Sequence, residues 1–163
     1  MFINVRGIKS KINSNILQDL CKNYDIVGFA ETFSNSFDKT VFSDFNVYTG
    51  GNENKLKAFH GLALMVKTTF QYIFSETSVG LWCKIKCKSE QFNIGLFYAP
   101  CEGSRYWTND FFNKIEFDIS EKQTRDKNVI VMGDFNARTS NVTEFTDLEN
   151  ESIPEIRLSQ DKK

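Results

Sequence analysis

The amino-acid sequence predicts a single α+β domain with much antiparallel sheet. Five short apolar segments, bounded by polar turns, follow one another between positions 45 and 98, which is the pattern of a β-meander. Two stretches with apolar residues at helical spacing lie on either side of this meander. The length of 163 residues and the 40% hydrophobic content agree with one domain that has its own core.

The N-terminal part is expected to contain strand, helix and strand. Residues 2–5 form a short apolar segment before a glycine turn, and residues 25–32 form a second one that ends on a carboxylate. The helix between them is predicted from apolar residues on one face, namely Ile12, Ile16, Leu17, Leu20, Cys21 and Tyr24. The meander strands that follow are predicted at residues 45–49, 61–66, 69–74, 81–87 and 92–98.

A second helix and a last strand complete the predicted order. Thr108 is expected as the helix N-cap, with Trp107 and Phe112 as a hydrophobic staple. The buried stripe of this helix is expected to contain Phe111, Ile115 and Ile119. The apolar run at residues 129–132 then predicts a buried strand that ends in a turn at Gly133.

Polar side chains lie at the ends of four of these strands. Asn4, Glu31 and Tyr98 each follow an apolar run, and Asp134 and Asn136 follow the last one. If the chain stays extended after Gly133, Asp134 and Asn136 point to the same side. Each position has a simpler interpretation: a solvated turn, an Asp that bonds its own backbone, or, for Tyr98, a core aromatic. Several converging oxygens would instead suit a divalent cation and a phosphodiester.

The order of five motifs resembles the endonuclease/exonuclease/phosphatase superfamily. The motifs are Asn-Val-Arg-Gly-Ile, Phe-Ala-Glu-Thr, His-Gly-Leu-Ala-Leu, Leu-Phe-Tyr-Ala-Pro and Gly-Asp-Phe-Asn-Ala-Arg. Within this superfamily the chain is most similar to the endonuclease domain of non-LTR (LINE-type) retrotransposons. The resemblance implies a DNase I-like fold: a two-layer β-sandwich flanked by helices, with the active site along one edge. It also implies a hydrolase that cleaves DNA phosphodiesters with Mg²⁺ or Mn²⁺.

The resemblance assigns a role to each strand-end residue. Glu31 is implied as the principal metal ligand, with Asn4 and Asp134 beside it. Asp134 is implied as the base that deprotonates water, Asn136 as the group that orients it, and Tyr98 as a hydrogen-bond donor to the phosphate. Asparagine and carboxylate oxygens suit Mg²⁺ and disfavour zinc.

DNA is the implied partner, together with a fused reverse transcriptase in the full-length relative. Arg6, Lys9 and Arg138 are expected to contact nucleic acid, and the cluster of Arg6, Lys9 and Lys11 lies close to Asn4 in sequence. The formal net charge is only −1, so the chain as a whole is not basic. Solvated surface charge is the alternative interpretation of these residues.

We expect the chain to be a partial copy of such a domain, with residues 1–163 as one partial domain and residues 141–163 as an acidic tail or linker toward further strands. Members of the family end in an Asp-His pair that nothing here matches, and the only histidine is His60. Two alternatives therefore stay open. One is a phosphatase or phosphodiesterase of the same superfamily that acts on small or lipid phosphoesters, and the other is a non-catalytic remnant that binds nucleic acid or a partner.

The sequence carries no signal peptide and no apolar run long enough to span a membrane. Its four cysteines lack the spacing of a zinc site, and Cys83 and Cys87 alternate with lysines as small buried residues of a strand would. A reducing compartment is the simplest fit, so we expect an intracellular protein, nuclear or cytoplasmic, without a membrane partner.

Overall fold

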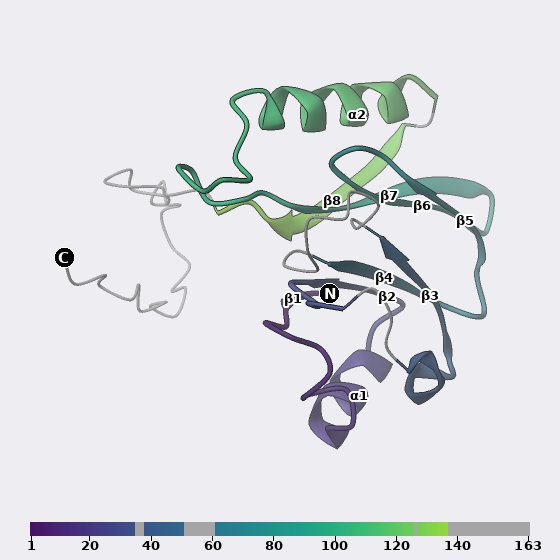
Figure 1. The fold of residues 1–163 in the computed structure, drawn as a ribbon. Coiled ribbons are helices and arrows are strands. Elements are labelled where there is room, and N and C mark those ends of the chain that lie inside the picture. The colour runs from purple at the N-terminus through teal and green to yellow at the C-terminus, as the bar shows by residue number, and fades with distance from the viewer. Residues whose placement is uncertain (35–37, 51–60, 126, 137–163) are drawn as a thin grey trace, which may run out of the picture.

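The computed structural model describes residues 1–34, 38–50, 61–125 and 127–136. Within these residues the strands form two four-stranded sheets that pack face to face, with α1 outside one sheet and α2 outside the other (Figure 1). This arrangement confirms the predicted α+β, two-layer sandwich flanked by helices. The expected acidic tail at residues 141–163 lies outside the described residues. No helix in the described part of the chain is long and apolar enough to cross a membrane.

The first sheet joins the N-terminal strands to one meander hairpin. Its strand order is β1-β2-β4-β3, in which β1 and β2 are parallel and the other pairs are antiparallel. The bounds are Phe2–Asn4 for β1, Ile26–Ala30 for β2, Phe45–Gly50 for β3 and Leu62–Lys67 for β4. The helix α1 spans Asn15–Lys22, and a 3-10 helix, η1, spans Lys39–Phe42.

The second sheet contains the rest of the meander and the last strand. Its order is β5-β6-β7-β8, with β7 and β8 parallel. The bounds are Gln71–Glu76 for β5, Gly80–Cys87 for β6, Glu90–Tyr98 for β7 and Asn128–Asp134 for β8; α2 spans Phe111–Arg125. In both parallel pairs the two strands are connected through a helix, α1 between β1 and β2 and α2 between β7 and β8. Parallel strands need such a crossover connection.

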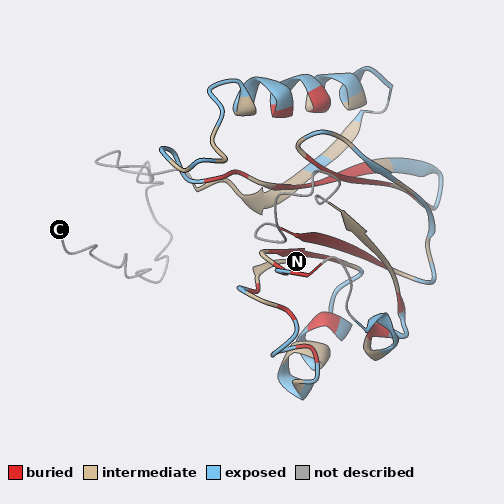
Figure 2. Cartoon of the chain, in the orientation of Figure 1, coloured by how far each residue is buried: buried red, intermediate tan, exposed pale blue. Residues whose placement is uncertain are grey.

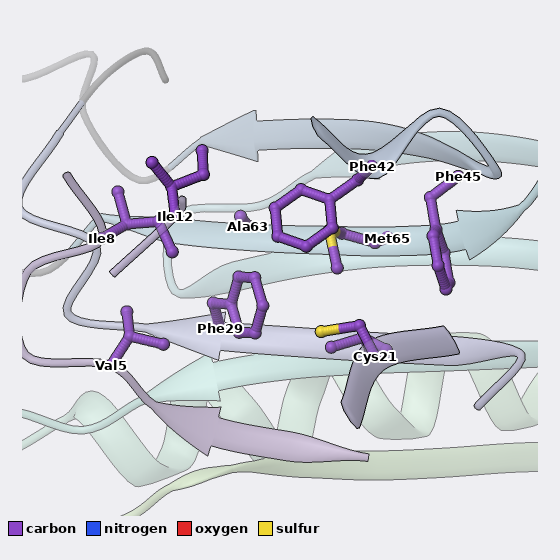
Figure 3. Packing of buried hydrophobic residues seen from close by; sticks show 10 residues of the cluster. Val5, Ile8, Ile12, Cys21, Phe29, Phe42, Phe45, Ala63 and Met65 are labelled. Carbon is purple, nitrogen blue, oxygen red and sulfur yellow. The ribbon is translucent and has the colours of Figure 1, made fainter. Parts of the chain in front are cut away.

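Alternation along β2 and β4 builds two layers of core from the same strands. Phe29 and Met65 point toward α1 and η1, where Phe42 lies 6.0 Å from Phe29 between ring centroids (Figure 3). The next residues along, such as Leu64, point into the sandwich and meet Leu96 of β7. Buried residues accordingly concentrate in the strands between the two helices (Figure 2). This arrangement is expected for strands that are covered on both faces, because successive side chains point to opposite faces of the sheet.

A third cluster lies under α2 on the outer face of the second sheet. Trp82 and Phe97 pack edge to face at 5.4 Å, and Ile115 of α2 closes over them. Phe111 and Ile119 pack against the same cluster, which confirms the predicted stripe of this helix. The expected N-cap is wrong by two residues, because α2 begins at Phe111 and Thr108 instead forms the preceding turn. Trp107 and Phe112 are nevertheless in contact at 5.7 Å.

Two other expectations about burial are wrong. The helix α1 begins only at Asn15, so Ile12 is buried but belongs to the turn before the helix. Ile16, which was expected on the buried face of the helix, is 82% exposed. Leu17 and Cys21 pack on the core, and Ile16 and Leu20 lie one residue, or about 100°, around the helix from them. The strand β8 is also only half buried, with Ile130 49% exposed, because it is an edge strand within the described residues.

Candidate active site

The parallel pairing of β1 and β2 brings Asn4 and Glu31 together. Asn4 lies opposite Ala30 in the register, so Glu31 comes directly beyond the end of the paired segment. The Asn4 Nδ2 donates a hydrogen bond to the Glu31 Oε1 over 2.9 Å. A backbone bond from Gly7 N to the Glu31 carbonyl continues the link between these two strand ends. Local strand geometry therefore places a carboxamide against a carboxylate.

The second sheet delivers its polar residues to the same point. Tyr98 and Asp134 lie opposite each other at the ends of the parallel strands β7 and β8. The Tyr98 hydroxyl donates to the Glu31 Oε1 over 2.9 Å, and the Asn4 Nδ2 donates to the Asp134 Oδ2 over 2.9 Å. Four strand ends from two sheets thus meet around one carboxamide. The sequence predicted four strands with polar ends, and the sandwich supplies the contact between the two sheets.

Asn136 reaches this group through a turn, not through an extended continuation. The strand β8 ends at Asp134, and Asn136 has a φ of 44°, so strict alternation does not apply beyond the strand. The Asn136 backbone N–H donates to the Asp134 Oδ1 over 3.0 Å, which is the ordinary Asp turn that the sequence left open. The Asn136 side chain donates to the Ala99 carbonyl over 2.6 Å. The turn therefore holds both residues beside the end of β7.

Gly133 provides space at this position. Gly133 belongs to β8 and its φ is not in the left-handed region, so the expected turn at Gly133 is wrong. A Cβ on Gly133 would lie 2.2 Å from the carbonyl oxygen of Phe97 on the neighbouring strand. Only glycine allows β8 to approach β7 this closely, and that approach sets the position of Asp134.

Tyr98 is held in its protonated form. The pKa of Tyr98 is raised from its ordinary 10.0 to about 12, chiefly by burial and also by the hydrogen bond to Glu31 and the charge of this carboxylate, against a smaller opposing effect of Asn136. The phenol is therefore a hydrogen-bond donor at any physiological pH. A tyrosine here can donate to an anionic oxygen but cannot act as a base.

Backbone strain is concentrated around this group. Arg6, Glu31 and Asn136 all have positive φ, at 43°, 52° and 44°. A non-glycine residue in this region costs on the order of 1–2 kcal/mol, and such residues are enriched at functional sites. Three of the five described non-glycine residues with positive φ are therefore residues that the sequence singled out as site candidates.

The donor set fits a magnesium-type ion better than a zinc-type ion. Within the described residues no three His, Cys, Asp or Glu side chains lie close enough together to hold a metal. Two carboxylates, Glu31 and Asp134, instead converge on one neutral amide. Mg²⁺ commonly uses one or two protein carboxylates and fills its other positions with water and substrate phosphate. The residues present fit such an ion.

The basic residues near the site differ in their roles. Arg6 and Lys9 are exposed, and the Arg6 backbone N–H donates to the Asn4 Oδ1 over 3.2 Å. Lys11 is used structurally, because its Nζ donates to the carbonyls of Val5 and Arg6. Arg138 and His60 lie outside the described residues. Arg6 and Lys9 form no ion pair with another described residue, so within the described part of the chain they are open to an external anion.

Sequence reasoning missed a cavity of about 710 Å³ beside the strand ends. Its wall contains Asp134 and Asn136, the aromatic residues Trp107, Phe112 and Phe135, and the loop residues Cys101, Glu102 and Gly103. Trp107 and Phe112 were predicted only as a helix staple, a local role that gives no indication of a neighbouring cavity. The cavity depends on the placement of the loop between β7 and α2, which local patterns do not determine.

Comparison with known families assigns the chain. The profile described as Endonuclease/Exonuclease/phosphatase family matches residues 1–149, which include all four strand ends. The chain belongs to this family. Family members are hydrolases that act on phosphoester bonds, and they generally use divalent metal ions. No curated protein matches the sequence significantly.

Solved structures from several sources share this fold. The human Nocturnin catalytic domain gives a TM-score of 0.58 at 16% identity and covers 83% of this chain and 62% of its own. The endonuclease domain of TRAS1, a telomere-specific non-LTR retrotransposon, gives 0.61 at 14% identity and covers 85% and 58%. An AP endonuclease from Archaeoglobus fulgidus gives 0.56 at 16% identity and covers 86% and 58%. The chain therefore spans less than two thirds of the length of these structures.

Proposed function

We propose that this chain is the catalytic part of a Mg²⁺-dependent endonuclease that hydrolyses DNA phosphodiesters, of the type found in non-LTR retrotransposons. The observation that carries the proposal is the convergence of Glu31 and Asp134 on the Asn4 amide at the ends of β1, β2 and β8. The fold shared with the TRAS1 endonuclease domain and with the archaeal AP endonuclease supports the nuclease class.

In this proposal Asn4, Glu31 and Asp134 bind the cation together, and Asp134 also acts on the attacking water. Glu31 holds the cation with Asn4, and Asp134 completes the site. The bound cation would polarise the phosphate and offset charge on the leaving oxygen, which is worth several kcal/mol. Asp134 also accepts the proton of the attacking water, and such base catalysis contributes about 10²–10⁴-fold.

The remaining residues position the phosphodiester. When substrate binds, Tyr98 donates to a phosphate oxygen in place of Glu31, a role that its raised pKa supports because the hydroxyl stays protonated. Asn136 orients the water beside Asp134. Arg6, Lys9 and Arg138 contact the DNA backbone, and the exposure of Arg6 and Lys9 supports this for two of the three.

The testing experiment is cleavage of supercoiled plasmid in Mg²⁺ by the chain, by an Asp134→Asn variant and by an Asp44→Asn variant. Asp44 is exposed and carries the same substitution away from the site, so it is the matched control. We expect nicking by the chain and the control, loss of most of it in Asp134→Asn, and none in EDTA. Equal nicking by Asp134→Asn would refute the assigned base.

A second substrate panel separates the alternatives. Hydrolysis of small phosphomonoesters without nicking of DNA would place the chain with the phosphatases of the family. Absence of any hydrolysis would favour a binding remnant. A longer chain that carries the late Asp-His pair implied by the family resemblance should nick DNA much faster, because catalytic groups that act as a unit are non-additive.

A further inference from the structure

We propose that the cavity beside Asp134 binds an unpaired nucleobase next to the phosphodiester that is cleaved. This inference rests on the proposed function, since it names the part of the substrate that the cavity receives. The position of the cavity is the first argument. Asp134 and Asn136 belong both to its wall and to the strand-end group, so a ligand in the cavity touches the reaction site.

The walls suit a flat aromatic ligand. Trp107, Phe112 and Phe135 contribute rings to the cavity, and each is at least partly exposed. Trp107 and Phe112 hold each other edge to face at 5.7 Å, which leaves an aromatic surface fixed in place before any ligand binds. Base stacking on such side chains is the usual way in which proteins hold single-stranded nucleotides.

The charge of the cavity favours a base over a phosphate. The titratable side chains among the described residues that line it are two carboxylates, Glu102 and Asp134, and a thiol, Cys101. Where no cation is bound, carboxylates repel a phosphate but accept hydrogen bonds from the amino and imino N–H groups of bases. Arg105, which lies over the Tyr106 ring at 4.6 Å in the same loop, offers a cation outside the cavity for the backbone.

Volume and pairing complete the argument. A cavity of about 710 Å³ lies within the range of about 300–1,000 Å³ that small-molecule sites occupy, so it has room for a nucleoside. A base that enters it cannot be paired with a complementary strand. The chain should therefore cleave next to mismatched or single-stranded nucleotides faster than within a fully paired duplex.

The test uses two dinucleotides that contain the same phosphodiester. One carries two adenines, and the other replaces both nucleosides with abasic tetrahydrofuran units. Tryptophan fluorescence reports on binding, because Trp82 is 1% exposed and only Trp107 is open to a ligand. We expect saturable quenching by the adenine dinucleotide and much weaker binding of the abasic one.

Two phenylalanines of α2 provide a matched pair of variants. Phe112 lines the cavity and is 44% exposed, whereas Phe117 is 66% exposed and lies outside it, so both substitutions to Ala should leave the fold intact. Phe112→Ala should weaken adenine dinucleotide binding roughly tenfold, the order of one lost base–aromatic contact. Phe117→Ala should bind like the unaltered chain.

The outcomes separate this inference from the proposed function. Equal affinity for the two dinucleotides, or unchanged binding by Phe112→Ala, would overturn the base site even if plasmid nicking depends on Asp134. Base-dependent quenching that requires Phe112, in a chain that cleaves no phosphodiester, would support the site and refute the nuclease. Tighter binding of free tyrosine than of the dinucleotide would assign the cavity to a protein side chain and overturn the inference.

Discussion

Replacement of Glu31 by Gln should stabilise the protein in the absence of a divalent cation. Glu31 Oε1 and Asp134 Oδ2 each lie 2.9 Å from the same Asn4 nitrogen, so two like charges share one neutral donor. At a separation of roughly 5 Å their repulsion is between about 0.8 and 3 kcal/mol for effective dielectric constants of 80 and 20. Both residues are only partly buried, so water screens the repulsion and we expect about 1 kcal/mol.

Glutamine preserves the hydrogen bonds that this site uses. Asn4 and Tyr98 both donate to the Oε1 of Glu31, and a glutamine carbonyl can accept both bonds. Asp134 differs, because its Oδ1 accepts from Asn136 and its Oδ2 accepts from Asn4. Asp134→Asn therefore leaves one donor facing an amide N–H₂, which costs about 1–3 kcal/mol and cancels the relief of repulsion.

Thermal unfolding in EDTA and in MgCl₂ measures these effects. In EDTA the Glu31→Gln melting temperature should rise by about 2–4 °C, whereas the exposed control Glu116→Gln should not change it. In MgCl₂ at a hundred times the dissociation constant, the unaltered chain should gain about 2.7 kcal/mol and Glu31→Gln much less. A Glu31→Gln variant that melts lower than the parent in EDTA, or gains the same stability from Mg²⁺, would refute the reasoning.

Three further predictions test other parts of the structure. Gly133→Ala should lower the free energy of unfolding by about 1–3 kcal/mol in denaturant titration, because its Cβ meets the Phe97 carbonyl at 2.2 Å; a neutral effect would contradict the close approach of β7 and β8. The pKa of Tyr98, raised to about 12, lies above the ordinary 10.0, so its contribution to stability is full below pH 10 and is lost as the pH rises through 12. The unaltered chain should therefore lose stability more steeply than Tyr98→Phe between pH 10 and 12, and parallel curves would argue against a buried donor. A thiol reagent at pH 8 should label the exposed Cys101 first, whereas Cys21 and Cys83 should react only on unfolding. Burial raises the pKa of Cys21 to about 11 and that of Cys83 to about 12, so neither thiol is ionised at pH 8. Rapid labelling of Cys83 would contradict its place between the sheets.

The sequence predicted the strand ends well because their signals are local. Each of Asn4, Glu31, Tyr98 and Asp134 follows an apolar run whose side chains alternate between the faces of the sheet, and parallel neighbours align their ends. The resemblance to the family added the sandwich that joins the two pairs. The residue pattern alone did not predict that the two pairs of strand ends lie next to each other.

Features that depend on tertiary placement were less predictable. Ile16 and Leu17 are equally apolar, and only the crossing position of α1 decides which of them packs on Phe29 and its neighbours. The apolar run of β8 indicated a buried strand, but burial also depends on a neighbour that the described residues do not provide. Asn136 required a left-handed turn that asparagine tolerates but does not dictate.

The most direct test of the central claim is calorimetric titration of the 163-residue chain with Mn²⁺, compared with Glu31→Gln and Glu116→Gln. The claim is that the strand ends around Asn4 form one divalent-cation site. We expect one site per chain, at least tenfold weaker binding in Glu31→Gln and unchanged binding in Glu116→Gln. Binding that is the same in all three proteins would show that the cation is held elsewhere, and would contradict the account.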